Sequence, residues 1–472
     1  MNFIVYDIIL LFLFVISVSI FLYTKKKNLK KEGLLFLYKT SWGIKLINYF
    51  GNKYKRTLKV LSYVSIGTGY CLMIGMFYLF YTILKVYIFR PDIVSTIKVP
   101  PIMPLIPYID KIVPGLPSFY FIYWIIILAI IAISHELAHG IFAAYNKVKI
   151  KKTGFGFFPF FLPVFLAAFV ELDEEKMKKK SKFSQMAILS AGTFANVLTA
   201  IFFFGIMLLL FSIAFTASGV VFDSYAYSIV GISSISSING ISLNNTSYEK
   251  VLSLVNETGL NEIGTGNNTY VITKEFLENQ KDNAEYVILY DDAPAINAGL
   301  LGVINKIGDV KIDSREKLSE ELLKHSPGEE IIIKTKKEKE ILEYVIVLGE
   351  HPENESLPWL GIGFLEQKRA GIMGEVYSLL SSFKKPNVYY EPICEASSFV
   401  YNLLWWLILI SISVAFINML PVGIFDGGRF FYLTILAITG SETKAKKSFV
   451  FMTYFFLFLL FLLMAFWAWS FF

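Results

Sequence analysis

Charged side chains are scarce in this chain of 472 residues. Only 17% of the residues are Asp, Glu, Lys or Arg, whereas 55% are hydrophobic and Phe alone occurs 44 times. A soluble globular protein needs far more charge to cover its surface, so most of this chain is expected to lie in lipid. The composition therefore excludes an ordinary soluble protein and predicts a polytopic α-helical membrane protein.

Cysteine and histidine are rarer still, with two Cys and four His in the whole chain. Cys71 and Cys394 are too few for a scaffold held by several disulfides, and no Cys cluster is present to bind a metal. The net charge of +6 does not indicate a nucleic-acid partner, because Lys and Arg flank the apolar segments as they do in membrane proteins. The lipid bilayer is therefore the expected partner, and nucleic acid is not.

Six apolar segments are long enough to cross a bilayer as helices. Basic residues follow the first segment, whereas a signal peptide carries its positive charge ahead of the apolar run, so a retained span is expected. Because Lys and Arg concentrate on the cytoplasmic side, both chain ends are predicted to lie outside a multi-pass protein of the cell membrane. The six segments are residues 3–23, 61–89, 118–146, 184–216, 396–419 and 448–470.

One strongly apolar stretch, residues 154–170, differs from these spans. It is short, and two Gly and two Pro interrupt it. Basic residues lie on both sides, so the chain is expected to enter and leave the membrane on the cytoplasmic face. We predict a re-entrant or interfacial hairpin here, and a short kinked helix is an equally open alternative.

Residues 217–395 have a different composition, with more charge and more Asn, Ser and Gly. Two units of strand, tight turn, strand and helix are predicted, at 235–255 and at 303–324, and strands at 329–335 and 341–348 continue the second. With Ala298-Gly299-Leu300 ahead of it, the second unit resembles a protease-associated PDZ domain, although Gly308-Asp309 stands where Asn-Gly is expected. We predict an extracytoplasmic α+β PDZ-like insertion of one or two units; a generic small α+β domain is the alternative.

Two of the four His lie together in Ser134-His135-Glu136-Leu137-Ala138-His139-Gly140. Four residues apart, His135 and His139 share one face of a helix, with Glu136 beside them. This pattern is typical of two zinc ligands and a carboxylate that takes a proton from water. At 1.5 Å per residue, His135 would lie ~16 Å from the cytoplasmic end of its span. A metal inside the membrane, nearer the cytoplasm, is therefore predicted.

Zinc hydrolases use three protein ligands, so a third ligand must come from elsewhere in the chain. Asp426 is the best candidate, because it lies between apolar segments near the cytoplasmic side and precedes two Gly that let the backbone turn. Taken alone, Asp426 is more typical of a helix cap or a turn. Glu171 and Asp173, which follow the hairpin, are the alternative ligands.

Three motifs in order carry a resemblance to a known family. His135-Glu-Leu-Ala-His139 in one span and Asn418-Met-Leu-Pro-Val-Gly-Ile-Phe-Asp426-Gly-Gly in a later one resemble the site-2 protease family of intramembrane zinc metalloproteases. Between them, Gly192-Thr-Phe-Ala-Asn196 is similar to the Gly-x-x-x-Asn element of that family, although Thr193 stands where Pro is commoner. The resemblance implies one zinc ion held by His135, His139 and Asp426, with Glu136 as general base and then proton donor. It implies that Asn418, Asn196 and Gly192 bind substrate; hydrogen bonding between helices is the alternative role of the two Asn.

The same resemblance implies hydrolysis of peptide bonds in transmembrane segments of membrane-anchored proteins. The active site is expected toward the cytoplasm and the PDZ-like region outside. A metal-transit site is a second hypothesis from the residues. Such a site would need neither Glu136 nor the Gly-Gly turn, so the presence of both disfavours it. A catalytically inactive scaffold is a third, which the complete motif disfavours. The expected domain plan is accessory helices at 1–117, protease core at 118–216, insertion at 217–395, third core helix at 396–440 and a last helix at 441–472.

Overall fold

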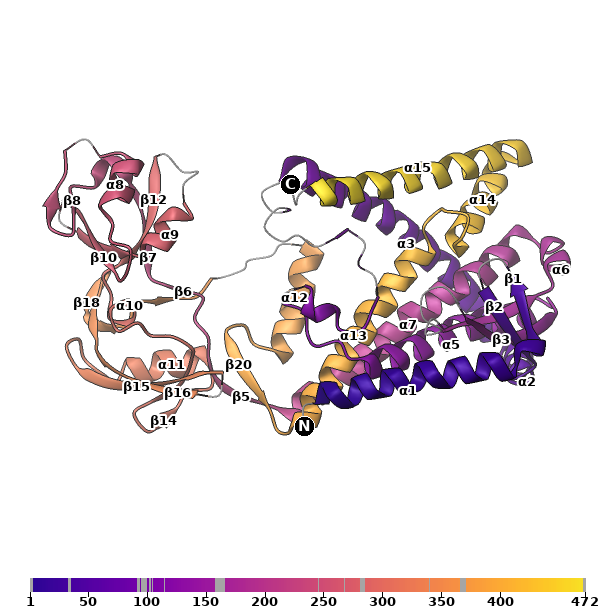
Figure 1. The fold of residues 1–472 in the computed structure, drawn as a ribbon, viewed down its shortest axis with the longest axis horizontal. Helices are drawn as coiled ribbons and strands as arrows, with labels where there is room; N and C mark the ends of the chain where they lie inside the picture. The colour runs from indigo at the N-terminus through magenta and orange to yellow at the C-terminus, as the bar shows by residue number, and fades with distance from the viewer. Residues whose placement is uncertain are drawn as a thin grey trace. The chain divides into compact units, whose positions relative to one another are not determined.

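The chain folds into two compact units, a helical one and a β-rich one (Figure 1). The helical unit comprises Met1–Leu209 and Ser398–Phe472, and the β-rich unit comprises Leu210–Ser397. The computed structural model describes residues 3–32, 35–90, 94, 100, 101, 103, 105–113, 115–157, 166–244, 246–266, 268–280, 285–338, 340–365 and 371–469.

Six helices in the described part of the chain are long and apolar enough to cross a membrane, which confirms the six predicted spans. The shortest has 22 residues and is therefore ~33 Å long, which matches the thickness of a bilayer's hydrocarbon core. They are α1 (Phe3–Thr24), α3 (Lys55–Phe89), α5 (Phe121–Tyr145), α7 (Lys182–Ala214), α13 (Glu395–Asn418) and α15 (Glu442–Trp469). A shorter helix, α14 (Asp426–Thr439), packs against α15.

A four-stranded antiparallel sheet belongs to the helical unit. Its strands are β1 (Leu29–Glu32), β2 (Leu35–Thr40), β3 (Ile150–Phe157) and β4 (Leu166–Leu172), in that spatial order, so β4 forms one edge. The described parts of the predicted 154–170 hairpin are therefore paired strands, not a kinked helix. The remainder of that prediction, 158–165, lies outside the described residues. The pairing of β2 with β3 joins two segments more than a hundred residues apart.

A short helix, α2 (Ile44–Lys53), packs on the C-terminal half of α5. Glycines allow the close approach, because a Cβ on Gly51 would stand 2.6 Å from the Ala144 side chain and one on Gly140 would stand 2.9 Å from Ile47. Ile47 is itself buried in this contact. The helix that carries the two histidines is therefore held on one side by α2.

The first span is tied to the beginning of α5 by a buried carboxylate. Asp7 of α1 is only 2% exposed and accepts hydrogen bonds from the backbone N–H groups of Phe121 (2.6 Å) and Ile122 (3.0 Å). The Tyr108 hydroxyl donates a third bond to it, at 2.8 Å. The first N–H groups of a helix have no partner within it, so Asp7 caps α5 from a neighbouring helix.

Small and hydroxylated residues join α3 to α7 in the interior of the helical unit. The Ser65 and Ser190 hydroxyls lie 2.7 Å apart, and Gly69 brings α3 against the side chain of Ser190. Small residues at helix contacts and hydrogen bonds between helices are the usual means of packing within lipid. The second span is thus bonded directly to a helix of the predicted protease core.

The described part of the β-rich unit contains two larger sheets, each with its own buried core, and two two-stranded sheets, β17-β18 and β19-β6. The fold class of a helical membrane protein with a β-rich insertion is confirmed. The first sheet has the order β7-β12-β11-β10-β8-β9 and the second β16-β15-β13-β5-β20, with β14 on β13. Both predicted strand–turn–strand–helix units are present, as β8-β9-α8 and β13-β14-α11. Their identity as PDZ domains stays a prediction. In the first of these sheets β12 is paired on both edges, with β7 and β11.

The remaining elements are α6 (Glu174–Lys178), β5 (Phe215–Val220), β6 (Ser224–Tyr225), β7 (Tyr227–Gly231), β8 (Ser237–Ile238), β9 (Ile241–Ser242), α8 (Tyr248–Leu254), β10 (Asn261–Thr265), β11 (Asn268–Ile272), α9 (Lys274–Glu278), β12 (Tyr286–Asp291), α10 (Pro294–Asn297), β13 (Val303–Ile307), β14 (Val310–Lys311), α11 (Arg315–Leu322), β15 (Glu330–Lys337), β16 (Glu340–Val347), β17 (Gly349–His351), β18 (Asn354–Trp359), β19 (Ile362–Gly363), α12 (Gly371–Phe383) and β20 (Val388–Pro392).

Candidate metal centre

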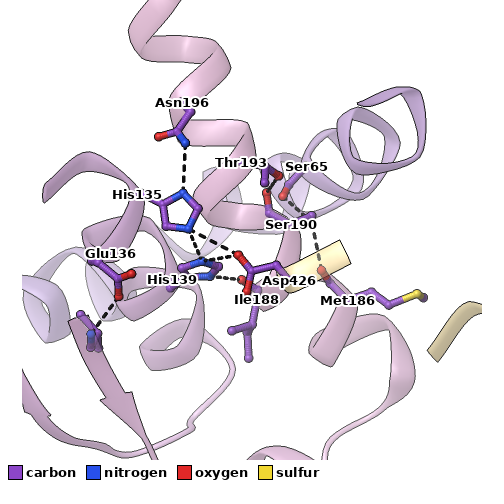
Figure 2. A network of polar contacts seen from close by, with 11 residues as sticks. Ser65, His135, Glu136, His139, Met186, Ile188, Ser190, Thr193, Asn196 and Asp426 are labelled. Atoms are coloured by element: carbon purple, nitrogen blue, oxygen red, sulfur yellow. Dashed lines mark hydrogen bonds and ion pairs between the residues drawn. The ribbon is translucent and has the colours of Figure 1, made fainter. Parts of the chain in front are cut away.

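Helix α5 presents His135 and His139 on one face, one turn apart, and both residues are buried. Their Nε2 atoms are 3.0 Å from each other. Figure 2 shows the two rings directed toward the same point, where the carboxylate of Asp426 meets them. The spacing of four residues thus has the consequence expected on a helix.

Asp426 is the first residue of α14 and reaches the two rings from the other end of the chain. Its Oδ2 atom lies 3.2 Å from Nε2 of His139 and 3.4 Å from Nε2 of His135. The two glycines after it allow this position. A Cβ on Gly427 would stand 2.3 Å from the backbone of Met419, and one on Gly428 would stand 2.4 Å from the Val422 carbonyl oxygen.

The hydrogen bond of His139 to the backbone determines which of its ring nitrogens can accept a bond at the metal centre. Its Nδ1 atom is 2.7 Å from the carbonyl oxygen of Ile188, which can only accept, so Nδ1 carries the proton and donates. The Nε2 atom of the neutral ring then holds a lone pair and faces the carboxylate of Asp426, which is also an acceptor. Two acceptors at this distance repel each other unless a proton or a metal cation lies between them. The centre is built for a cation.

Asn196 of α7 contacts the outer nitrogen of His135. The side-chain amide lies 3.1 Å from Nδ1, is fully buried, and has an oxygen with no hydrogen-bond partner among the described residues. Amide oxygen and nitrogen are nearly indistinguishable in shape, so the oxygen accepts from Nδ1–H when the amide is turned over. That tautomer leaves the Nε2 lone pair of His135 for a metal.

Gly192 has no side chain, and this leaves space beside the imidazole rings of His135 and His139. A Cβ there would stand 2.4 Å from Nε2 of His139 and 2.5 Å from Nε2 of His135. Two nitrogen or oxygen ligands of a tetrahedral zinc ion lie ~3.4 Å apart when each is 2.0–2.1 Å from the metal. The three donor atoms are 3.0–3.4 Å apart, so both their spacing and their chemistry fit zinc.

Glu136 lies beside the two histidines and is held by the sheet. Its Oε2 atom accepts a hydrogen bond from the backbone N–H of Val170 in β4, at 2.8 Å. Glu136, the two histidines and Asp426 line one cleft of about 840 Å³, and residues 168–172 line the same cleft. A polypeptide in this cleft would touch the metal centre, the carboxylate and the edge of β4 together.

The other candidate residues are distributed as follows. Glu171 forms an ion pair with Lys39 at 2.7 Å, and Asp173 caps α6 by accepting from Lys176 N–H, so neither alternative ligand joins the three donors. Asn418 lines the cleft. Thr193, in place of the commoner Pro, lies within the continuous helix α7, and its hydroxyl donates to the Ser190 carbonyl at 2.9 Å. Predicted substrate contacts of Asn418, Asn196 and Gly192 stay predictions.

Three contributors to the site were not predicted from the sequence. The carbonyl of Ile188 and the N–H of Val170 are backbone groups, and no residue type marks them. Asp7, by contrast, is the one ionisable side chain in the first apolar run. A charge in a membrane segment is a signal of function or of a specific partner, so its importance for α5 was open to prediction.

Comparison with known proteins agrees with this geometry. Residues 123–462 match the sequence model of peptidase family M50. The match includes α5, α7, α13 and α14, and so every side chain that meets at the metal centre. No curated protein matches the sequence.

Proposed function

The chain belongs to peptidase family M50, the site-2 protease type of intramembrane metalloprotease, and we propose that it cuts the transmembrane segments of membrane-anchored proteins. One observation carries the proposal. The cluster of His135, His139 and Asp426 is built around a helix that is itself long and apolar enough to span the membrane. A protein substrate follows from the family, and a substrate segment inside the bilayer follows from the position of the cluster.

We assign His135, His139 and Asp426 as the three ligands of one zinc ion. When bound, zinc supplies a Lewis acid that polarises the peptide carbonyl and makes water a nucleophile near neutral pH. The protein orients the two rings through their outer nitrogens, which bond to Asn196 and to the Ile188 carbonyl. Such bonds to the far side of a ligating imidazole fix its tautomer and its direction.

Glu136 acts as the general base and then as the proton donor. Its carboxylate would take a proton from the attacking water and pass it to the nitrogen of the leaving strand. Since Val170 N–H holds only Oε2 in place, the other oxygen is available for this transfer. The same hydrogen bond keeps the carboxylate on the side of the cleft where β4 lies.

A substrate must be unwound before it is cut, because the hydrogen bonds of a helix shield its peptide groups. The edge of β4 offers replacements for those bonds. Val170 N–H points away from β3 toward Glu136, so the backbone groups of Ala168, Val170 and Leu172 face outward from the sheet, and all of them except Val170 N–H are left for a partner strand. We propose that the substrate pairs with this edge as an added strand and so presents an extended backbone to Glu136.

Disulfide trapping tests this strand addition. Single cysteines at Ala168 or Leu172, in a chain whose Cys71 and Cys394 are replaced by Ser, should crosslink to cysteines placed along a substrate's apolar segment. Crosslinks should alternate along the substrate with a period of two, as in a strand. A period of three to four residues, or no crosslink at any position, would contradict the added strand.

We further propose that the metal centre lies toward the cytoplasm and the inserted unit outside the membrane. The support is the distribution of basic residues, which concentrate beside the ends of α1, α5 and α7 that lie nearest the four-stranded sheet. The inserted unit would then exclude substrates that still carry a bulky outer domain. Removal of residues 225–390 should abolish the preference for trimmed over intact substrates while zinc remains bound; an unchanged preference would contradict this role.

The position of the cut tests the proposed function. The purified full chain, reconstituted with a reporter that carries one apolar segment between two soluble tags, should release fragments whose new ends map inside that segment by mass spectrometry. A second reporter with the same tags and a polar linker in place of the segment should stay intact. Cuts confined to the tags, or equal cleavage of both reporters, would contradict an intramembrane protease.

A further inference from the structure

Helix α2 has two different flanks beside its buried side. At 100° per residue, Ile44, Ile47 and Gly51 form the side that packs on α5, and Lys45, Tyr49 and Lys53 lie opposite to it. Leu46 and Phe50 are exposed on one flank, and Asn48 and Asn52 are exposed on the other. A helix with an apolar flank, a polar flank and cations between them is typical of one that lies along a membrane surface.

The charge around α2 has one sign. No Asp or Glu occurs between residues 33 and 91, a stretch that contains Lys45, Lys53, Lys55, Arg56 and Lys59. All five cations are exposed, and none forms an ion pair with a described residue. The Lys53 ammonium donates a hydrogen bond to the Tyr49 hydroxyl and lies 5.5 Å from the ring centre of Tyr54, so two tyrosines hold it in place without neutralising it.

Helix α2 lies at the level of the spanning helices' ends, where lipid headgroups are expected. It packs beside the C-terminal end of α5 and directly precedes α3, so it lies at an end of two spanning helices. Figure 1 shows α2 at the end of the helical unit that also carries the four-stranded sheet. Trp42, just ahead of α2, is 75% exposed, and a Trp at this level is typical of the membrane interface.

We propose that the exposed side of α2, with Lys45 and Lys53 at its centre, is a binding surface for the phosphate headgroups of anionic phospholipids. Leu46 and Phe50 would enter the acyl region while Asn48 and Asn52 stay in water. On its buried side, α2 contacts α5 through Ile47 and Gly140, the residue directly after His139, so a lipid bound here steadies the metal-binding helix.

Lipid retention tests the proposal without reference to catalysis. The detergent-solubilised full chain is titrated with phosphatidylglycerol or with phosphatidylcholine, and the lipids retained are counted by native mass spectrometry. Phosphatidylglycerol should be retained at lower concentrations than phosphatidylcholine. Replacing Lys45 and Lys53 by Gln should weaken phosphatidylglycerol retention about fivefold for each lysine, with no change for phosphatidylcholine. Inorganic phosphate should not displace the lipid, because it has no acyl chain for Leu46 and Phe50.

The matched control removes the same charge elsewhere. Lys444 and Lys446 are exposed at the beginning of α15, and their joint replacement by Gln should leave retention within twofold of the unaltered chain. If the two double variants lose phosphatidylglycerol equally, the preference is a diffuse effect of net charge and the proposed surface is wrong. Equal retention of the two lipids by the unaltered chain would also overturn it. Neither outcome depends on whether the protein is a protease.

Discussion

The backbone of Gly192 in α7 lies so close to the imidazole of His139 in α5 that a Cβ atom on Gly192 would stand 2.4 Å from Nε2. The atom would occupy the space in which the three donors converge. Gly192→Ala is therefore expected to weaken zinc binding at least tenfold, measured by competition with a chromophoric chelator, and to reduce cleavage in proportion. The overall fold should survive, because Ala favours a helix over Gly by about 1 kcal/mol.

Gly205 provides the control for this substitution. It lies in the same helix, and nothing is within 4 Å of the Cβ that an Ala would add. Gly205→Ala should bind zinc as the unaltered chain does. Equal zinc affinities for the Gly192 and Gly205 variants would mean that the space beside His139 is not the metal site.

Asn196 is expected to act on the metal through His135. Asn196→Leu removes the group that accepts from Nδ1–H and should lower zinc affinity by about 10–100-fold, whereas Asn196→Asp keeps an acceptor and should restore most of it. The measurement is zinc affinity in the absence of substrate, so a role in substrate binding alone would leave both variants unchanged. Equal losses in the Leu and Asp variants would argue against an acceptor role.

Asp7 should stabilise the fold from outside the protease core. Asp7→Ala removes the side-chain acceptor and leaves two backbone N–H groups at the beginning of α5 without partners, which is expected to cost about 2–3 kcal/mol. The unfolding temperature of Asp7→Ala in detergent should be several degrees lower than that of the unaltered chain. The decrease should be smaller for Asp7→Asn, which retains one acceptor oxygen. Ser17→Ala, an exposed position on the same helix, is the control and should not shift. An unchanged unfolding temperature for Asp7→Ala would show that α1 contributes nothing to α5.

An ion pair in the β-rich unit should make its stability depend on pH. Hydrogen bonds from the Lys336 ammonium and the Ser218 hydroxyl lower the pKa of Glu391, which links β20 to β15 and β5. Because the pKa of Glu391 is lower in the folded chain than in the unfolded chain, the ionised carboxylate stabilises the fold at pH values above its unfolded pKa of about 4.3. This stabilisation is lost as the pH falls through the pKa of the folded state. The pair is part-exposed, so Glu391→Gln should cost no more than about 1 kcal/mol.

Hydrogen exchange of the β20 segment measures this effect. At neutral pH the unaltered chain should exchange more slowly than Glu391→Gln, by up to about fivefold. Well below pH 4 the two chains should exchange alike, since the carboxyl is then protonated in both. A difference that persists at low pH would mean that packing, not charge, holds β20 in the sheet.

Much of the helical unit was open to prediction because the signals are local. A run of apolar residues specifies a span wherever it occurs, and His135 and His139 share a face because a helix repeats every 3.6 residues. Asp426 could be proposed from its depth and its neighbouring glycines. Its meeting with the histidines depends on α14 packing against residues 419–423, which no local pattern reveals.

The four-stranded sheet shows where such reasoning ends. From the sequence, residues 29–40 are predicted only to belong to a basic segment between the first two spans. In the structure they form a hairpin whose second strand pairs with β3. Pairing between distant strands is decided by tertiary context, and a single sequence does not specify the partner. The positioning bonds from Val170 N–H and the Ile188 carbonyl belong to the same class, because backbone groups are identical in every residue.

The most direct test of the whole account is Glu136→Gln. Gln keeps the size of the side chain and an acceptor for Val170 N–H, but it cannot take up the proton of the attacking water. Zinc content and cleavage of the reporter with an apolar segment should be measured on the same preparations, before and after chelation and zinc restoration. The account predicts that the variant retains one zinc ion per chain and loses cleavage, while the unaltered chain loses cleavage on chelation and regains it with zinc. Cleavage by Glu136→Gln at the rate of the unaltered chain would contradict it.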